Sequence, residues 1–276
     1  MPDLLIGLIG DNIAASRAHE LHGNAGRLCD IEVQYDKLVP RELGLDFDGV
    51  FQYALDRGYN ALNITYPYKE MAAAKVTIPS PLVRAMGAIN TIVFGAGEPQ
   101  GYNTDYSGFV GAYKSVRGGA KPGTVCMIGA GGVGKAVAFG LLDVGLEEIR
   151  LVERDLPRAE ALAASLQSVR PDLTVSVSSD PVAASAGADG LINCTPVGMV
   201  GYDGTPLAQE HMAGAAWLFD AVYTPVNTQF LTDAREAGLT AISGYELFFH
   251  QGVDCWRLIS GKDVDPAALR VALSQS

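Results

Sequence analysis

Lys69 and Asp105 are the residues of this sequence best suited to moving a proton. Lys69 ends the segment Asn63–Lys69 (N-I-T-Y-P-Y-K), and Asp105 ends Gly101–Asp105 (G-Y-N-T-D). A lysine that exchanges protons near neutral pH needs a depressed pKa or a proton relay, and a nearby carboxylate orients it and stabilises its charged form. Taken alone, Lys69 is typical of a solvated surface charge and Asp105 of a locally bonded turn. The segment that follows them in the chain favours a catalytic role for both.

That segment is a glycine-rich loop (G-A-G-G-V-G) between a strand predicted at residues 124–128 and a helix predicted at 135–142. A G-x-G-x-x-G loop in this strand–turn–helix context is typical of dinucleotide binding. The first glycine allows the tight turn, the second lets the backbone approach the pyrophosphate, and the third permits close helix packing. The helix N-terminus then presents free amides to the phosphates. We predict that the cofactor contacts Gly129, Ala130, Gly131, Gly132, Val133 and Gly134.

Glu153 bears on the choice between NAD and NADP. It ends the next predicted strand, residues 149–153, at the place where an acid normally binds the ribose hydroxyls of the adenosine. Glu153 and Asp155 would both repel the 2′-phosphate of NADP, whereas Arg154 between them is able to pair with it. The pattern favours NAD and leaves NADP open.

Hydride transfer from a secondary alcohol also requires a base for the hydroxyl proton, and the reverse reaction requires an acid. A single group that is able both to accept and to donate this proton serves oxidation and reduction alike. No grouping of His, Cys, Asp and Glu has zinc-site spacing, and His19 and His22, one helical turn apart, have no third ligand. We therefore expect no metal, and Lys69 and Asp105 are the best acid–base candidates.

The composition predicts a globular protein of about two domains, because 276 residues, 48% of them hydrophobic, are able to bury a large core. A net charge of −11 argues against nucleic acid or an anionic membrane as partner, but leaves a small anionic substrate possible. The four cysteines are far apart and are expected to be buried, reduced thiols. The N-terminus has no basic region and only a short apolar run, so we expect a cytoplasmic location.

Short runs rich in Leu, Ile and Val alternate with helical stretches, which predicts an α/β protein with mostly parallel sheets. Strands are expected at residues 4–9, 31–35 and 61–64, a helix at 16–27, a hairpin between 87 and 105, and an apolar-rich helix at 245–259. A turn-rich segment at 118–123 precedes a new periodic pattern. We place the start of the second domain near it.

Several motifs in the same order make the chain similar to the shikimate dehydrogenase family over nearly its whole length. Residues 63–69 resemble the family's N-V-T-x-P-F-K, residues 87–91 (G-A-I-N-T) its G-A-x-N-T, and residues 101–105 its G-x-N-T-D. The resemblance implies that Lys69 and Asp105 form a catalytic dyad. It also implies that the substrate contacts Ser16, Asn63, Thr65, Asn90, Tyr223 and Gln251.

Residues 193–199 (N-C-T-P-V-G-M) resemble the family's N-x-T-x-x-G-M segment, which lies along the cofactor near the nicotinamide. The resemblance implies cofactor contacts from Thr195, Pro196, Gly198 and Met199, in addition to Glu153 and Arg154. It further implies an N-terminal α/β substrate-binding and catalytic domain at residues 1–108, joined by C-terminal helices at 245–276. A Rossmann-type, doubly wound dinucleotide-binding domain would occupy residues 109–244.

The chain departs from the family where two hydroxyls usually hold the substrate carboxylate. The family's S-x-S-P is Ser16-Arg17-Ala18-His19 here, so one hydroxyl is missing. Losing a hydrogen bond to a charged group costs about 1.5–3 kcal/mol, so the carboxylate is held differently, bound more weakly, or absent from the substrate. Arg17 and His19 are candidate replacements, and Ser16 is also compatible with a simple helix cap.

We expect an oxidoreductase that interconverts 3-dehydroshikimate and shikimate with NAD or NADP. Ala18 and Glu153 leave open a paralogue that acts on quinate or aminoshikimate. A third hypothesis is a sensor that binds dinucleotide and a shikimate-like cyclic hydroxy acid without turnover. The methylene-tetrahydrofolate dehydrogenases also use a lysine, but Asn103–Asp105 and Gln251 fit them less well. We expect neither nucleic acid nor a membrane as a partner. We expect the protein to be a monomer or a homodimer.

Overall fold

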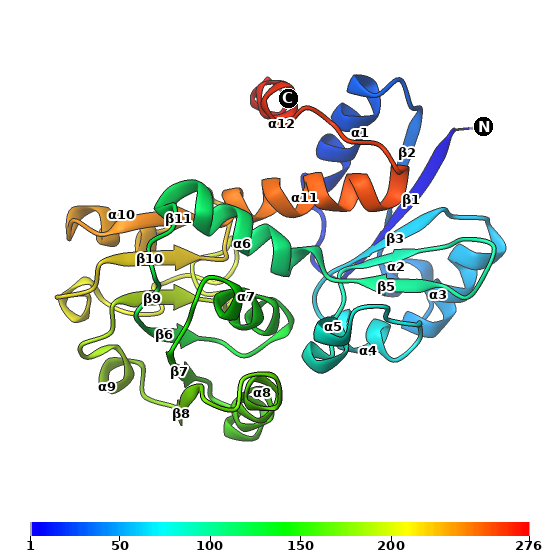
Figure 1. Ribbon diagram of the computed structural model, residues 1–276. Helices are drawn as coiled ribbons and strands as arrows, with labels where there is room; N and C mark the ends of the chain where they lie inside the picture. The colour runs from blue at the N-terminus through cyan, green and yellow to red at the C-terminus, as the bar shows by residue number, and fades with distance from the viewer. Residues whose placement is uncertain (1, 276) are drawn as a thin grey trace. The chain divides into compact units, whose positions relative to one another are not determined.

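The computed structural model describes residues 2–275 and divides the chain into two compact units. Unit 1 contains the chain up to Thr104 and from Gln251 onward, and unit 2 runs from Asp105 to His250. Each unit has its own β-sheet (Figure 1). The predicted α/β class, with an N-terminal α/β domain and a Rossmann-type domain, is confirmed.

Unit 1 is built on a five-stranded sheet whose first three strands in space are parallel. Its order is β2 (Val33–Leu38), β1 (Leu4–Ile9), β3 (Ala61–Ile64), β4 (Thr91–Val93) and β5 (Gln100–Tyr102). Strands β4 and β5 run antiparallel as the predicted hairpin. Strand β3 is buried along its whole length, and all of its residues except Asn63 are apolar, because sheets with helices on both faces bury both sides of a central strand.

The helices of unit 1 flank this sheet (Figure 1). They are α1 (Ala18–Leu28), α2 (Pro40–Leu43), α3 (Phe47–Asp56), α4 (Lys69–Ala73), α5 (Pro81–Met86) and α12 (Pro266–Ser274). Two further helices, α6 (Thr104–Arg117) and α11 (Gly244–Ser260), have residues in both units. The predicted domain boundary at residue 108 therefore falls inside a helix, and the one at residue 245 lies at the start of another.

Unit 2 is built on a six-stranded parallel sheet. Its order is β8 (Thr174–Ser178), β7 (Glu148–Val152), β6 (Thr124–Ile128), β9 (Gly190–Asn193), β10 (Trp217–Asp220) and β11 (Thr240–Ser243). The connecting helices are α7 (Gly132–Asp143), α8 (Leu156–Val169), α9 (Pro181–Ser185) and α10 (Gln229–Glu236), and Gln209–His211 forms a 3₁₀ turn. The strand order reverses between β6 and β9, which is where doubly wound sheets bind ligands.

Two predicted elements begin two residues later than expected. Helix α1 starts at Ala18 rather than at residue 16, and β2 starts at Val33 rather than at residue 31. The second shift follows from the turn after α1, where Asp30 adopts a φ of 55° and the Ile31 amide bonds the Gly26 carbonyl at 2.9 Å. Ile31 is thus part of a helix C-terminal turn, a role that its β-branched side chain does not reveal.

Candidate functional site

The glycine-rich loop of unit 2 lies at the carboxyl end of β6, beside the segment that follows β9. The Gly129 amide bonds the Val152 carbonyl at 2.8 Å, and the Cys194 amide bonds the Ile128 carbonyl at 2.7 Å. Gly129 has a φ of 102°, and a Cβ there would come within 2.7 Å of the Cys194 backbone. The loop and the residue 193–199 segment therefore meet at the point where the strand order reverses.

The other two glycines of the loop have different surroundings. A Cβ on Gly134 would lie 2.4 Å from the Gly129 carbonyl oxygen, so only glycine lets α7 pack this closely on the loop. A Cβ on Gly131 would meet no described atom within 4 Å. Gly131 is the N-cap of α7, and no side chain caps that helix. Its first-turn amides are the groups that a phosphate binds at a helix N-terminus.

Glu153 contacts the glycine-rich loop directly. One of its carboxylate oxygens accepts from the Ala130 amide at 2.9 Å, and the other accepts from the Arg154 amide at 2.8 Å. The carboxylate is half-buried directly after β7, whereas Arg154 and Asp155 are exposed. An acid in this place suits the two ribose hydroxyls of NAD and opposes a 2′-phosphate.

Buried polar side chains fix the segment after β9. Asn193 accepts from the Thr195 amide and hydroxyl at 3.0 and 2.6 Å, and its amide group donates to Asp220 at 2.9 Å. Asp220, which ends β10, also accepts from the Thr228 hydroxyl at 2.5 Å. Burial raises the pKa of the Asp220 carboxyl to about 6, although these hydrogen bonds favour its charged form. The sequence drew attention to Asn193 through its motif but not to Asp220.

A continuous chain of hydrogen bonds joins seven side chains of unit 1. In order, they are Tyr35, Asn63, Cys255, Thr91, Asn90, Thr104 and Gln251. The Tyr35 hydroxyl donates to Asn63 at 2.9 Å, and Asn63 donates to the Cys255 sulfur at 3.1 Å. Asn63 and Thr91 are cross-strand partners on β3 and β4, and Cys255 of α11 contacts both.

The second half of the chain surrounds Asn90. Its oxygen accepts from the Thr104 amide at 2.8 Å, while its amide group donates to the Thr104 hydroxyl at 2.9 Å. Gln251 accepts from Thr104 at 3.2 Å and from Asn90 at 3.5 Å. The structure thus brings together Asn63, Asn90 and Gln251, three of the residues predicted to bind substrate. Thr104, Thr91 and Cys255 were not singled out, although Thr91 and Thr104 lie inside motifs.

Lys69 is the first residue of α4, and it lies next to a tightly held turn. The Tyr68 amide bonds the Thr65 carbonyl at 2.9 Å, and the Tyr68 ring stacks on Phe47 with ring centroids 5.3 Å apart. The Lys69 carbonyl accepts from the Ile89 amide at 3.0 Å, one residue before Asn90. Lys69 and Thr65 are half-buried in unit 1. Asp105, 6% exposed, lies in the first turn of α6.

The two residues predicted to replace the missing hydroxyl, Arg17 and His19, bond groups other than the Ser16 hydroxyl. Arg17 binds Glu20 at 2.6 Å and the Leu273 carbonyl at 2.9 Å, so it ties α1 to α12. His19 contacts the Ser16 carbonyl through its Nδ1 atom at 3.0 Å and is exposed. The Ser16 hydroxyl accepts from the Ala18 amide at 3.3 Å, which resembles a capping contact, but the N-cap of α1 is Arg17.

His22 faces the interior of unit 1. Its ring stacks on Tyr35 with centroids 5.4 Å apart, and burial lowers its pKa to about 4. Its Nδ1 atom is buried and has no hydrogen-bond partner among the residues that the structure describes. Within residues 2–275 no group of three His, Cys, Asp or Glu side chains is arranged to hold a metal ion. Tyr223 of unit 2 stacks on Phe248, 5.0 Å between centroids.

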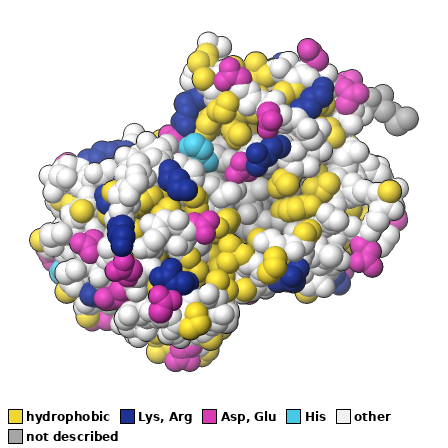
Figure 2. All heavy atoms as spheres, viewed as in Figure 1, with side chains coloured by type: hydrophobic (Ala, Val, Ile, Leu, Met, Phe, Trp, Pro, Cys, Tyr) yellow, Lys and Arg dark blue, Asp and Glu magenta, His cyan; other side chains and the backbone are white. Residues whose placement is uncertain are grey.

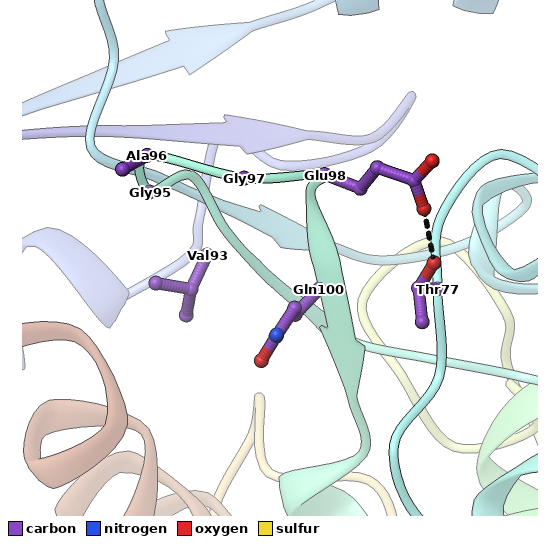
Figure 3. Close-up of a pocket in the computed structure, with 7 residues that line it drawn as sticks. All are labelled: Thr77, Val93, Gly95, Ala96, Gly97, Glu98 and Gln100. Carbon is purple, nitrogen blue, oxygen red and sulfur yellow. Dashed lines mark hydrogen bonds between the residues drawn. The ribbon is translucent and has the colours of Figure 1, made fainter.

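One hollow of unit 1 is lined by none of the predicted site residues. This hollow, beside the β4–β5 hairpin, is lined by Thr77, Val93, Gln100 and residues 95–98, with Glu98 accepting from Thr77 at 2.8 Å (Figure 3). Figure 2 shows Lys and Arg side chains in separate groups interspersed with Asp and Glu on the face in view.

The cysteines match the prediction in part. Cys126, Cys194 and Cys255 are buried thiols, and burial raises the pKa of Cys126 to about 12, but Cys29 is half-exposed at the end of α1. None of the helices described between residues 2 and 275 combines the length and apolarity needed to cross a membrane.

Comparison with known proteins gives concordant matches. Residues 8–92 match the model of the shikimate dehydrogenase substrate-binding domain. Shikimate dehydrogenase (NADP(+)) from Pseudarthrobacter chlorophenolicus is 37% identical, with 96% of this chain and 92% of that protein covered. Quinate/shikimate dehydrogenase (NAD(+)) from Corynebacterium efficiens is 36% identical, with 97% and 96% covered.

Solved structures extend this similarity to the whole fold. Quinate dehydrogenase from Corynebacterium glutamicum, in complex with NAD, superposes with a TM-score of 0.90 at 32% identity, covering 99% of both chains. Shikimate 5-dehydrogenase from Thermus thermophilus, in complex with NADP(H) and shikimate, gives a TM-score of 0.84 at 31% identity, again with 99% of both chains. With its ordered motifs, its two sheets and relatives matched over nearly their full length, this chain belongs to the shikimate dehydrogenase family.

Proposed function

We propose that the protein is an NAD(P)-dependent dehydrogenase that interconverts shikimate and 3-dehydroshikimate. The observation that carries the proposal is the hydrogen-bonded chain of unit 1, because it joins amides from three distant parts of the sequence, Asn63, Asn90 and Gln251. A side-chain amide both donates and accepts, which suits the hydroxyls of a polyhydroxylated ring. Relatives named for shikimate and quinate support this substrate class.

In this proposal Lys69 takes the hydroxyl proton during oxidation and returns it during reduction. Asp105 orients Lys69 and stabilises its charged form. The nicotinamide cofactor, when bound, accepts or supplies the hydride. The substrate ring is bound by Asn63, Thr65, Asn90, Tyr223 and Gln251. The Ser16 hydroxyl helps to bind the substrate carboxylate.

The residues of unit 2 fit a dinucleotide. The open space at Gly131 and the uncapped first turn of α7 suit the pyrophosphate, and Glu153 suits the adenosine ribose. The segment Thr195, Pro196, Gly198 and Met199 would lie along the nicotinamide, held by the Asn193 hydrogen bonds. We propose NAD as the preferred cofactor, because Glu153 faces the loop while Arg154 is exposed.

Quinate is the second candidate substrate. The contact between Glu153 and the glycine-rich loop favours NAD as the cofactor. The relatives named for both quinate and shikimate are NAD(+) proteins, so the same contact favours quinate as a substrate. Aminoshikimate is a further alternative substrate, because the hydroxyl missing at Ala18 leaves the identity of the substrate open.

Initial rates on shikimate and on quinate, each with NAD and with NADP, test the proposal. We expect turnover of shikimate, with the higher kcat/KM for NAD. The Lys69→Ala variant, purified in the same way, is the control for contaminating host dehydrogenase. Cofactor binding without turnover of either substrate would contradict the proposal and favour the sensor hypothesis. The cytoplasmic location and the monomeric or homodimeric state stay predictions.

A further inference from the structure

We infer that Lys37 binds the substrate carboxylate in place of the hydroxyl that is missing at Ala18. The inference rests on the proposed function and concerns a residue outside the family motifs. Lys37 lies on β2, and its ammonium donates to the Ala14 carbonyl at 2.6 Å. Ala14 belongs to the four-residue turn that the bond from the Ser16 amide to the Ile13 carbonyl closes at 3.0 Å. The ammonium is thereby anchored to the turn that ends at Ser16.

The register of the sheet places Lys37 in the same row as the proposed substrate groups. Lys37 pairs with Leu8, Leu8 pairs with Asn63, and Asn63 pairs with Thr91 across four neighbouring strands. Paired residues of adjacent strands point to the same face of a sheet. Lys37 therefore lies on the face that presents Asn63, at the end of the row nearest the Ser16 turn.

Lys37 has unused capacity to bind an anion. An ammonium has three donors, and the Ala14 carbonyl takes one of them. Lys37 is exposed, and among residues 2–275 no carboxylate forms an ion pair with it. Arg17, by contrast, is already neutralised by Glu20 at 2.6 Å. Of Arg17 and Lys37, Lys37 is thus the cation beside this turn that remains available for a substrate.

Ser16 complements this cation. Its hydroxyl already accepts from the Ala18 amide at 3.3 Å, so its own proton is directed elsewhere and is available to a carboxylate. A hydroxyl on one side and an ammonium on the other would hold the carboxylate at two points. The bond from Lys37 would join two opposite charges, whereas the hydroxyl that Ala18 lacks would bring a neutral donor to the carboxylate.

The test compares Lys37→Ala with the wild-type protein on shikimate and on its uncharged methyl ester. We expect KM for shikimate and quinate to rise about 10-fold or more, with kcat nearly unchanged, because the contact does not touch the reacting atoms. KM for the methyl ester should not change. Lys262→Ala is the matched control, since Lys262 is also exposed in unit 1 and also donates to a backbone carbonyl, that of Cys29 at 3.3 Å. Adding Ala18→Ser to Lys37→Ala should recover part of the lost affinity for shikimate but not change the ester.

Calorimetric binding of shikimate without cofactor separates this inference from the proposed function. If the wild-type protein binds shikimate without turning it over, and Lys37→Ala binds it about 10-fold or more weakly, the proposed reaction fails and the role of Lys37 stands. Equal affinities in the two proteins, an equal loss for acid and ester, or no binding by the wild-type protein would overturn the role of Lys37.

Discussion

At the scale of single residues, Lys69 and Asp105 are predicted to affect the chemical step rather than binding. Lys69→Ala and Asp105→Asn should each lower kcat by about 100-fold or more, the range for loss of general acid–base catalysis. Cofactor affinity, measured by fluorescence titration, should stay unchanged because neither Lys69 nor Asp105 belongs to the glycine-rich loop after β6. Lys75→Ala, which removes an exposed lysine paired with Asp48 at 2.8 Å, is the control. Turnover within about twofold of wild type in both variants would rule out the dyad.

Glu153 is predicted to set the cofactor preference. Glu153→Ala removes the carboxylate that faces the Ala130 amide and would repel a 2′-phosphate, so the ratio of kcat/KM for NADP to that for NAD should rise about 10-fold or more. Glu160→Ala, an exposed acid on α8, removes the same charge away from the loop and should leave the ratio unchanged. A ratio that moves equally in both variants would mean that net charge, and not this site, determines the preference.

At the scale of elements, the same added methyl group should affect folding stability at one glycine of the loop and cofactor binding at another. Gly134→Ala places a Cβ 2.4 Å from the Gly129 carbonyl, so α7 must shift, and we expect a loss of about 1–3 kcal/mol in the free energy of unfolding. Gly131→Ala meets no described atom and should leave stability nearly unchanged, but it should weaken dinucleotide binding because the methyl occupies the approach of the pyrophosphate.

Urea unfolding and cofactor titration of both variants check this pair. The prediction fails if Gly131→Ala destabilises the protein as much as Gly134→Ala, or if Gly131→Ala binds the cofactor as tightly as the wild-type protein does.

The elements were predictable where periodicity and turn chemistry agree locally. Strands β1 and β3 and the β4–β5 hairpin follow from short apolar runs bounded by turn-forming residues, and the strand–loop–helix around β6 follows from its glycines. The start of β2 was not predictable, because the turn at Asp30 depends on the preceding helix. The roles of Cys255 and Asp220 were hidden for a similar reason, since each acts through hydrogen bonds to residues far away in the sequence.

At the scale of the whole molecule, the two units are predicted to respond to pH in opposite directions. His22 of unit 1 has a pKa of about 4, below its ordinary value of 6.5, so the unfolded state binds more protons and unit 1 becomes more stable as pH rises from about 4 to 6.5. Asp220 of unit 2 has a pKa of about 6, above its ordinary value of 3.8, so the folded state binds more protons and unit 2 becomes less stable over nearly the same range. Each effect is about 3 kcal/mol at 1.36 kcal/mol per pKa unit.

The two tryptophans make this measurable, because Trp256 lies in unit 1 and Trp217 in unit 2. Urea unfolding followed by fluorescence, at about pH 4.5 and about pH 7, should give a higher midpoint at pH 7 in Trp217→Phe, which reports on unit 1. The midpoint should be lower at pH 7 in Trp256→Phe, which reports on unit 2. Midpoints that move in the same direction would contradict the prediction, and Asp220→Asn should abolish the change in unit 2.

The order in which a ribosome delivers the chain matters for unit 1. Strands β1 to β5 are synthesised before unit 2, but Cys255, which bonds Asn63, and Leu273, which bonds Arg17, are synthesised after it. Unit 2, an unbroken stretch from Asp105 to His250, is able to fold as soon as it emerges. The polar groups of Asn63 and Asn90 therefore stay open to solvent until the segment with Gln251 and Cys255 has been synthesised. Unit 1 begins before unit 2 in the chain and is completed after it.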